Sequence, residues 1–306
     1  MWTRPCVVFG CFLSCLLAGV VPALAEQPRL VLDADTANEL DDLYAIHRIL
    51  RQDKYEVVAL NSAQWWHYLS SPRGGTTVEA SHQLNEDLVR LLDCPDLPLF
   101  KGSAEPLGKP WGGEDPKDSA AARAIIRLAR ETPPDEKLVV VCIGASTNLA
   151  SALVMAPEIT PRVRAYLLGF QYDVDRAVWN KSEFNIRRDL NAADLLLNNE
   201  ALELWVMPAN VAKPLTFARD PAWEKHRRMG ELGGYLTERW ETAAGSNETW
   251  VMWDLALVEA MLSPELATVE LRDTPPENTP RKVHVYTSID SPAMEAAYWR
   301  IALPGR

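Results

Sequence analysis

Short, continuously apolar segments alternate with amphipathic helical patterns along most of this 306-residue chain. An apolar segment without alternation predicts a strand buried on both faces, and helices between such strands supply the crossovers that parallel strands require. The chain therefore predicts an α/β fold with a mostly parallel central sheet and helices on both faces. The predicted strands are 29–32, 56–62, 97–100, 138–143, 163–168, 202–207 and 283–287.

Helices are predicted between and after these strands, where apolar residues recur at helical spacing. No linker, composition shift or internal repeat interrupts residues 26–306, so we predict one domain there. The predicted loops 62–77 and 101–118 are long for connectors, and long loops at one end of an α/β sheet often carry function. The predicted helices are 40–50, 78–92, 119–130, 148–155, 192–200, 221–243, 249–262 and 293–301.

The N-terminus has the pattern of a secretory signal peptide. Arg4 provides the positive charge, residues 6–21 form an apolar run, and Ala23-Leu24-Ala25 is an A-x-A cleavage site. We therefore predict a signal peptide over residues 1–25 and an exported mature chain, periplasmic or secreted, that begins at Glu26. No segment of the mature chain approaches the ~20 apolar residues that a membrane-spanning helix needs.

Two other interpretations of the N-terminus stay open: an uncleaved membrane anchor, and a lipid anchor at Cys11 or Cys15. Neither cysteine follows a good lipobox. The mature chain keeps Cys94 and Cys142, which are far apart and belong to no C-x-x-C pair. Neither a disulfide framework nor a zinc–thiolate site is therefore predicted.

Acidic side chains outnumber basic ones by 42 to 31, which gives a formal net charge of −11. A nucleic acid partner is excluded by this balance, because its phosphates must be met by Lys and Arg. The acidic balance instead fits a site where carboxylates surround a cation. The sequence leaves open whether the chain forms a homo-oligomer.

Four aspartates, Asp33, Asp35, Asp41 and Asp42, cluster just after the first predicted strand. The strand delivers the first two at its carboxyl end, where such sheets bind ligands, and the other two open the next helix. Carboxylates this close repel one another unless protons or a hard cation such as Ca²⁺ or Mg²⁺ neutralise them. Aspartates also favour helix N-termini without any ligand, but their presence at both the strand end and the helix start favours a divalent-metal site.

Three further segments contain candidate site residues. Asp254 interrupts an apolar run, so its carboxylate needs a metal or backbone N–H partners. Residues 142–148 follow the most apolar strand with small polar residues, which suit a ligand site and a helix cap equally well. In the segment 179–185, Glu183 and Asn185 could hold sugar hydroxyls, although a solvated loop fits the same pattern.

Taken in order, these segments resemble the calcium-dependent nucleoside hydrolases of the inosine–uridine-preferring type. The aspartate segment resembles the family's DxDxxxDD signature, in the NELDD form of a bacterial subgroup. Residues 141–150 resemble the family's second metal segment, and residues 183–185 match its EFN ribose motif. Asp189 falls in step after that motif, and Asp254 matches the family's late metal-binding aspartate.

The resemblance implies a Rossmann-related nucleoside hydrolase fold and hydrolysis of the N-glycosidic bond of a small ribonucleoside-like substrate, which releases base and ribose. Ca²⁺ would be held by the carboxylates of Asp35, Asp42 and Asp254 and by the backbone carbonyl of Ile143. Asp35 would also be the base that deprotonates the attacking water, and Asp33 would orient the loop from behind. The ribose would be held by Asp41, Asn180, Glu183 and Asn185.

The chain departs from the family pattern at three places. Five residues separate Asp35 from Asp41, where three are usual. The histidine that precedes the late aspartate and helps protonate the leaving base is Trp253 here, and the asparagine that ends the second-strand segment is absent near Trp65 and Trp66. We place Trp253 among the substrate-binding residues, because a tryptophan could stack on a base, although it could equally fill the pocket.

Two other functions remain open at this point. A ribosyl-ligand binding protein could keep the fold and the metal without efficient catalysis, which Trp253 in place of a histidine would explain. A metal-dependent phosphatase of the haloacid-dehalogenase type is suggested by Asp33-x-Asp35, but Ala37 stands where that motif has Thr or Val.

Overall fold

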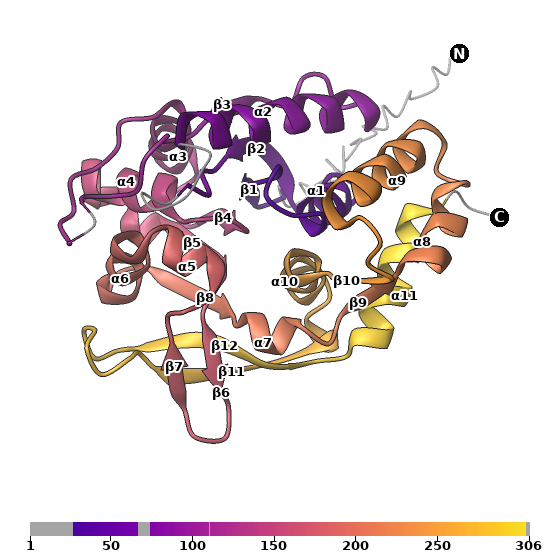
Figure 1. The fold of residues 1–306 in the computed structure, drawn as a ribbon. Helices are drawn as coiled ribbons and strands as arrows, with labels where there is room; N and C mark the ends of the chain where they lie inside the picture. The colour runs from indigo at the N-terminus through magenta and orange to yellow at the C-terminus, as the bar shows by residue number, and fades with distance from the viewer. Residues whose placement is uncertain (1–26, 67–73, 110, 304–306) are drawn as a thin grey trace, which may run out of the picture.

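A computed structural model describes residues 27–66, 74–109 and 111–303 (Figure 1). The predicted signal peptide and part of the predicted loop 62–77 lie outside these residues. An eight-stranded sheet forms the centre, in the order β11-β12-β8-β5-β4-β1-β2-β3. Its strands are β1 (Arg29–Ala34), β2 (Glu56–Ser62), β3 (Leu99–Lys101), β4 (Leu138–Cys142), β5 (Val163–Leu168), β8 (Glu203–Met207), β11 (Ala267–Asp273) and β12 (Lys282–Ile289).

The paired strands of this sheet are parallel except for β11 with β12, so the predicted mostly parallel sheet is confirmed. The chain runs from β1 outward to β2 and β3, then returns past β1 to β4, β5 and β8 on the other side. The strand order therefore reverses between β1 and β4, where Asp33 pairs with Cys142. In α/β sheets, ligands bind outside the carboxyl ends of the strands at such a reversal.

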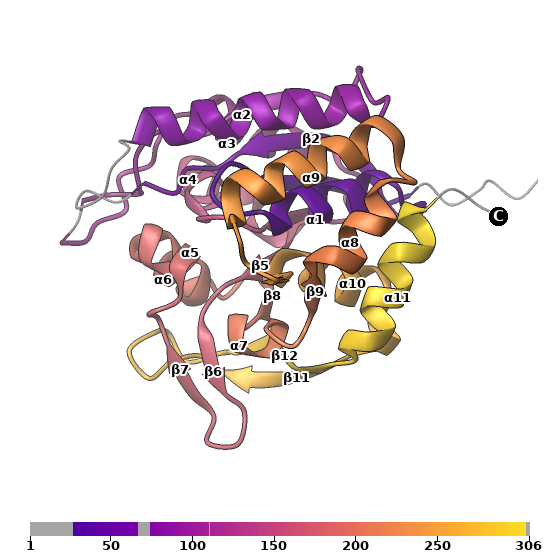
Figure 2. The same cartoon turned by 45° about the vertical axis from the view of Figure 1, so that its right-hand side comes forward.

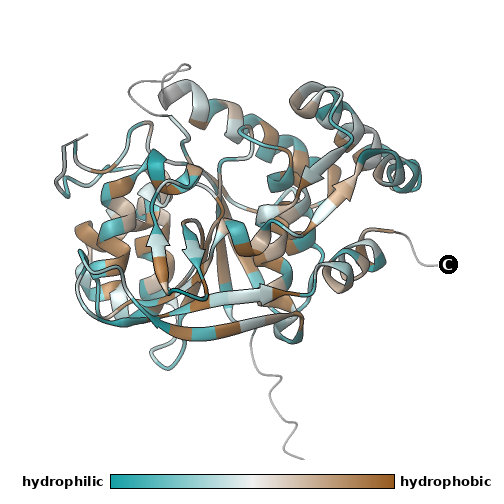
Figure 3. Ribbon diagram, turned by 60° about the horizontal axis from the view of Figure 1, so that its bottom comes forward, coloured by the Kyte–Doolittle hydropathy of each residue, from teal (hydrophilic) through white to brown (hydrophobic). Residues whose placement is uncertain are grey.

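Helices cover both faces of the sheet, as predicted, and each face has its own apolar core. One core takes side chains from α1, α2, α10 and α11, and the other from α3, α4 and α6. Figure 3 shows apolar and polar stripes alternating along the outer helices. The main helices are α1 (Asp41–Leu50), α2 (Gly74–Leu91), α3 (Ala120–Glu131), α4 (Thr147–Met155), α6 (Leu190–Asn198), α8 (Arg219–His226), α9 (Gly230–Ala244), α10 (Trp253–Leu262) and α11 (Ser291–Ala302).

The prediction of a single helix over 221–243 is wrong, because the structure has two helices there, α8 and α9 (Figure 2). Gly230 begins α9 with φ +64°, a left-handed conformation that interrupts the helical path. Gly233 then lies against the end of α8, since a Cβ on it would be 1.9 Å from the His226 carbonyl oxygen. Two helices can pack this closely only where a side chain is missing.

The predicted helix 249–262 begins later than expected, at Trp253. The preceding segment forms β10 (Thr249–Val251), which pairs with β9 (Thr216–Ala218). Thr, Trp and Val all favour strands, and the Met252 N–H donates to the Leu215 carbonyl (2.8 Å) rather than continuing a helix. This later start places Asp254 in the first turn of α10.

Several short elements are absent from the sequence prediction. A hairpin of β6 (Gln171–Asp173) and β7 (Val178–Asn180) projects from the body of the molecule in both Figures 1 and 2. The edge strand β11 and the short helices α5 (Phe184–Arg188) and α7 (Ala209–Ala212) lack a long apolar run that would mark them. Among the described residues, no helix has the length and apolar character that crossing a membrane requires.

Candidate active site

The candidate site lies at the reversal between β1 and β4. The Ile143 N–H donates to the Asp33 carbonyl (3.0 Å), which keeps the segments after the two strands side by side. The chain then turns after β1, where the Asn38 N–H donates to the Asp35 carbonyl (2.7 Å). Gly144 lies directly against Asp35, since a Cβ on Gly144 would be 2.9 Å from the Asp35 Cβ and Cγ. This close approach requires glycine.

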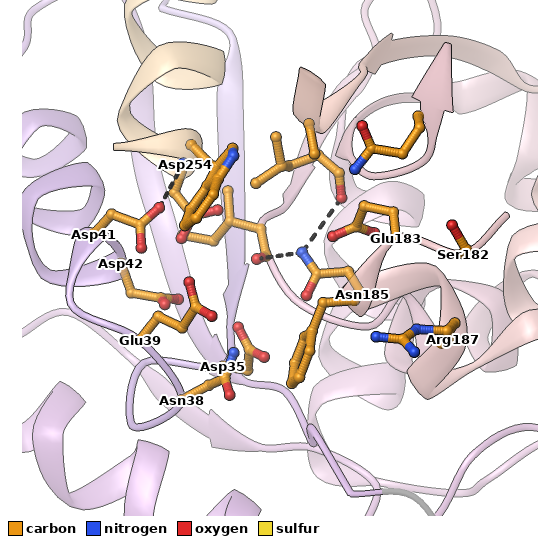
Figure 4. Close-up of a pocket in the computed structure, with 16 residues that line it drawn as sticks. Asp35, Asn38, Glu39, Asp41, Asp42, Ser182, Glu183, Asn185, Arg187 and Asp254 are labelled. Carbon is orange, nitrogen blue, oxygen red and sulfur yellow. Dashed lines mark hydrogen bonds between the residues drawn. The ribbon is translucent and has the colours of Figure 1, made fainter. Parts of the chain in front are cut away.

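Two helix N-termini supply the other carboxylates. Asp41 and Asp42 lie in the first turn of α1, and Asp254 lies in the first turn of α10. The Asp254 N–H donates to Asp41 Oδ2 (2.9 Å; Figure 4). One carboxylate oxygen from each of the three residues lies within 4.8 Å of the others. The positive ends of both helix dipoles therefore point toward one small volume.

A buried ion pair joins α1 to α10 behind these carboxylates. Arg48 Nε donates to Glu259 Oε1 (2.7 Å), and the Glu259 side chain is fully buried. Arg48 and Glu259 lie more than one helical turn beyond the aspartates on their respective helices. Losing either partner would leave the other charge buried and unpaired, so the pair opposes any sliding of one helix along the other.

Burial and mutual repulsion raise the pKa values of the carboxyl groups at this end of the sheet. Burial is the largest cause for each of them, and neighbouring carboxylates add to it. The pKa of Asp41 rises to about 6 and that of Glu39 to about 8, and the pKa values of Asp35, Asp42 and Asp254 rise well above the ordinary range. Without a cation, burial and repulsion therefore shift these groups toward their protonated forms.

Unpartnered oxygens show what the cluster fits. Asp35 Oδ2, Asp41 Oδ1 and Asp42 Oδ1 are buried without a hydrogen-bond partner. A donor set made only of oxygens suits a hard divalent cation such as Ca²⁺ or Mg²⁺, which would also remove the repulsion among the carboxylates. The buried aspartate cluster thus fits the metal dependence that the sequence predicts.

The opposite wall of the site comes from α5. Glu183 caps this helix, since the Ile186 N–H donates to Glu183 Oε2 (3.1 Å). Asn185 Nδ2 donates to the carbonyls of Ile143 (3.0 Å) and Leu168 (3.4 Å), which joins α5 to the ends of β4 and β5. Figure 4 shows Glu183 and Asn185 facing the aspartates across the site. Burial raises the pKa of Glu183 as well.

The two walls enclose a cavity of about 270 Å³, the carboxylate cavity. The structure thereby gathers residues that are up to 219 positions apart in the sequence, from Asp35 to Asp254. Most of the predicted site residues line this cavity, namely Asp35, Asp41, Asp42, Ile143, Glu183, Asn185, Trp253 and Asp254.

Residues 30–296 of this chain match the family described as inosine-uridine preferring nucleoside hydrolase. The chain belongs to this family. The prediction of a nucleoside N-ribohydrolase, an enzyme that acts on a small-molecule nucleoside, is thereby confirmed. A metal-dependent phosphatase finds no support in this match.

Two curated plant proteins are similar to this nucleoside hydrolase. It is 25% identical over 233 residues to "Probable uridine nucleosidase 2" of Arabidopsis thaliana, which covers 70% of this chain and 69% of that protein. It is 23% identical over 234 residues to "Probable uridine nucleosidase 1" of Oryza sativa subsp. japonica, which covers 70% and 68% respectively.

Solved structures of the family have the same fold. The inosine-guanosine nucleoside hydrolase superposes with a TM-score of 0.69 at 19% identity, over 91% of this chain and 100% of that one. The purine-preferring ribonucleoside hydrolase from Gardnerella vaginalis gives 0.66 at 19% identity, over 90% and 98%. These likenesses confirm the predicted nucleoside hydrolase fold.

The structure of this nucleoside hydrolase differs from the sequence-based expectation for Asn180 and for the metal-binding aspartates. Asn180 does not line the carboxylate cavity, because it ends the exposed strand β7 and its Oδ1 accepts from the Ser182 N–H (2.8 Å). The predicted contact of Asn180 with ribose therefore stays a prediction that this geometry does not support. In the metal cluster, Asp41 stands with Asp42 and Asp254 where Asp35 was expected. The assignment of Asp35 to the metal and of Asp41 to the ribose therefore also stays a prediction.

Sequence reasoning missed part of the cavity wall. Gln171 faces the cavity from β6, opposite Asn180 in the hairpin register. No sequence signal marks Gln171, because β6 itself is not predicted. Glu39, which lies within the aspartate segment, also lines the cavity. The lining residues that were not singled out are Asn38, Glu39, Leu168, Gln171, Ser182, Phe184, Arg187 and Ala209.

Two buried aspartates support the site from behind. Asp33 Oδ1 accepts from Asn148 Nδ2 (2.9 Å), and burial raises the Asp33 pKa to about 6. Asp189 Oδ2 accepts from Thr147 Oγ1 (2.6 Å) and from the Leu107 N–H (2.8 Å). The predicted place of Asp33 behind the loop agrees with this geometry. The signal for Asp189 was its position after the EFN motif.

Proposed function

We propose that this nucleoside hydrolase is an exported, calcium-dependent enzyme that releases base and ribose from ribonucleosides or related ribosyl compounds. The observation that carries the proposal is the arrangement of the carboxylate cavity. Buried carboxylate oxygens without partners line one wall, and Glu183 and Asn185, which are fixed by their own hydrogen bonds, line the other. A cation bound between the walls would satisfy the free carboxylate oxygens, and a ribose beside it would bond to Glu183 and Asn185.

The metal would be held by Asp42, by Asp254, by the Ile143 carbonyl and by one oxygen of Asp35 or Asp41. The Ile143 carbonyl already accepts from Asn185, but a carbonyl oxygen has a second lone pair. When bound, Ca²⁺ supplies a positive charge that lowers the pKa of a water molecule and orients it beside the ribose hydroxyls. Ca²⁺ is proposed over Mg²⁺ because the chain belongs to a family whose sequence pattern is the calcium-dependent one.

Asp35 would act as the general base toward the attacking water. Asp35 lines the cavity, and its Oδ2 is buried without a hydrogen-bond partner in the protein, so this oxygen is free to accept a proton. The carboxylates of Glu183 and Asp41 would stabilise the positive charge that develops on the ribose as the bond to the base breaks. Trp253 offers an aromatic face to the base but no titratable proton.

Ribonucleosides are the proposed substrate class, and the names of the relatives suggest which ones to test. The plant relatives are named for uridine, whereas the structural relatives are named for inosine, guanosine and purines. A panel should therefore contain both pyrimidine and purine ribonucleosides.

Purified protein should release reducing sugar from at least one nucleoside of this panel when Ca²⁺ is present, and EDTA should abolish the release. Asp35→Ala should reduce turnover by roughly 10³-fold, in line with the loss of a catalytic group. The proposal fails if no nucleoside is cleaved and Asp35→Ala changes nothing. Calorimetric binding of a nucleoside without turnover would instead identify a ribosyl-ligand binding protein.

Export is proposed from the signal-peptide pattern at residues 1–25. The full chain should be expressed in a bacterial host and its periplasm, medium and membranes analysed by intact mass. The expected product begins at Glu26 and is found outside the cytoplasm. A full-length mass in the cytoplasm, or a lipid-modified cysteine in the membrane fraction, would contradict this proposal.

A further inference from the structure

A second cavity adjoins the carboxylate cavity, and Arg187 lines both of them. Its volume is about 370 Å³. It lies between residues 105–109, 115 and 117 on one side and the start of α6 on the other, and we call it the donor cavity. Its lining residues are Trp66, Glu105, Pro106, Leu107, Gly108, Lys109, Asp115, Lys117, Arg187, Arg188, Asp189, Leu190 and Asn191.

Hydrogen bonds from a side chain of α6 to backbone carbonyls hold the wall of the donor cavity in place. Asn191 Nδ2 donates to the carbonyls of Leu107 (2.7 Å) and Lys109 (2.9 Å). Gly108 turns the chain with φ +62°, and a Cβ on it would be 2.1 Å from the Gly113 carbonyl oxygen. These contacts hold residues 107–109 against α6, so this part of the cavity wall belongs to the fold.

Among the described lining residues, the side-chain groups without a hydrogen-bond or ion-pair partner are mostly donors. Trp66 Nε1 and Arg188 Nε are buried without a hydrogen-bond partner. The side chains of Arg187 and Lys109 form no ion pair within the part of the chain that the structure describes. These groups supply N–H donors and positive charge, and they cannot accept a hydrogen bond.

The acceptors of the donor cavity are largely engaged. Asp189 Oδ2 accepts from Thr147 and from the Leu107 N–H, so it belongs to the wall. Glu105 forms an ion pair with Lys117 (3.8 Å). Asp115 keeps its carboxylate free among the described lining residues, and it is exposed to solvent, as are Arg187 and Lys109.

The two cavities therefore differ in the charge of their lining and meet at Arg187: the described lining of the carboxylate cavity has six acidic side chains and one basic, and that of the donor cavity has three acidic and four basic. The carboxylate cavity offers acceptors, which suit a cation and sugar hydroxyls. The donor cavity offers donors and positive charge between apolar surfaces of Trp66, Leu107 and Leu190. A ligand that fills both cavities needs hydroxyls at one end and an anionic acceptor group at the other.

We infer that the donor cavity binds a negatively charged, hydrogen-bond-accepting group carried by the ribosyl ligand, either a phosphate on the sugar or a carboxylate on the base. The inference rests on the proposed function, since it takes the ribosyl group to occupy the carboxylate cavity. It narrows the substrate class from neutral ribonucleosides to anionic ribosyl compounds.

Three matched ligands test the inference. Orotidine differs from uridine by a carboxylate on the base, and uridine 5′-monophosphate differs from it by a phosphate on the sugar. Dissociation constants of all three should be measured by calorimetry on the full mature chain with Ca²⁺, alongside turnover. At least one anionic compound should bind roughly tenfold more tightly than uridine, and salt should reduce this preference. Which compound gains affinity distinguishes the two sources of charge.

Two variants locate the preference in the donor cavity. Arg187→Gln should remove most of the preference for the anionic compound, and Lys109→Gln should reduce it. Arg176→Gln, at an exposed position in the turn between β6 and β7, is the matched control and should change neither. Circular dichroism checks that each variant folds.

The outcomes separate the inference from the proposed function. The inference is overturned if uridine binds as tightly as both anionic compounds, if none of the three binds, or if Arg187→Gln leaves the preference intact. If the anionic compound binds preferentially but no compound is hydrolysed, the inference stands and the proposed hydrolysis fails.

Discussion

The two walls of the carboxylate cavity differ in how their polar atoms are satisfied. The metal wall consists of Asp35, Asp41, Asp42 and Asp254, and three of these carboxylates keep a buried oxygen without a partner. The ribose wall consists of Glu183 and Asn185, whose side chains already bond to backbone groups of the protein. The metal wall thus keeps acceptor oxygens that a cation would satisfy, whereas the side chains of the ribose wall are already held by the protein.

This difference means that the two walls affect the stability of the fold in opposite ways. Packing carboxylates together without a counter-charge costs free energy, so the metal wall weakens the metal-free fold. The ribose wall stabilises the fold, because Glu183 caps α5 and Asn185 ties that helix to β4 and β5. Substitutions in the two walls should therefore have opposite effects on stability while both reduce activity.

Asp42→Asn should have the largest effect on activity. Removing this charge should lower kcat/KM by roughly 10³-fold, because the cation loses a carboxylate ligand. In EDTA, the same variant should unfold at an equal or higher temperature than the parent, since one repelling charge is gone. Thermal unfolding with and without Ca²⁺ measures both effects. Asp175→Asn, at an exposed turn position, is the control. If Ca²⁺ stabilises the variant as much as it stabilises the parent, Asp42 is not a metal ligand.

Glu183→Gln should have the next largest effect. The amide oxygen of Gln can still accept from the Ile186 N–H and cap α5, but the negative charge that faces the ribose is lost. We expect kcat/KM to fall by roughly 10²-fold, with Ca²⁺ affinity unchanged. Steady-state kinetics and a Ca²⁺ titration of the same preparation check this. Loss of Ca²⁺ binding would mean that the two walls are not separate.

Gly144→Ala tests the close contact that fixes Asp35 in the metal wall. The added methyl group would meet Asp35 Cβ and Cγ at 2.9 Å, so the Asp35 carboxylate must move. Because a catalytic group that is misplaced by a fraction of an ångström loses efficiency, kcat should fall by roughly tenfold or more. Gly234→Ala, at a position with open space, is the matched control. Unchanged kcat would show that Asp35 is not the base.

The sequence predicted the metal wall far better than the rest of the site. Asp33, Asp35, Asp41 and Asp42 follow one apolar strand, and chain connectivity alone places them at its carboxyl end. Asp254 comes from the other end of the chain, and only the resemblance to a family connected it with them. The local pattern around Asp254 could not show that α10 packs beside α1.

Sequence reasoning had least to work with on short elements. Asn180 and Gln171 face each other in the β6–β7 hairpin, whose strands have three residues each. Such short strands have no periodicity to detect, so the pattern could not show which of the two faces the cavity. Arg187 was missed for a related reason. It is a candidate binding residue only because it lines both cavities. Only the tertiary packing of the chain brings the two cavities together at this side chain.

The dependence of stability on Ca²⁺ and pH gives the smallest expected effect and the sharpest comparison of the walls. Burial raises the Asp41 pKa from 3.8 to about 6, and the pKa values of Asp42 and Asp254 rise as well. A carboxyl group with a raised pKa in the folded state contributes stability that is present below pH 3.8 and is lost as the pH rises through about 6. The metal-free protein should therefore lose stability across this interval.

Calcium should reverse this trend, because bound carboxylates must be ionised and metal binding then releases protons. Saturating Ca²⁺ should raise the unfolding temperature by roughly 5 °C or more at about pH 7.5, and by clearly less at about pH 5. Thermal unfolding at both pH values, with Ca²⁺ or EDTA, measures the difference. Glu183→Gln should keep this pattern and Asp42→Asn should lose it. An equal Ca²⁺ shift at both pH values would mean that the cation binds elsewhere, since only buried carboxyl groups with raised pKa values make its affinity depend on pH in this interval.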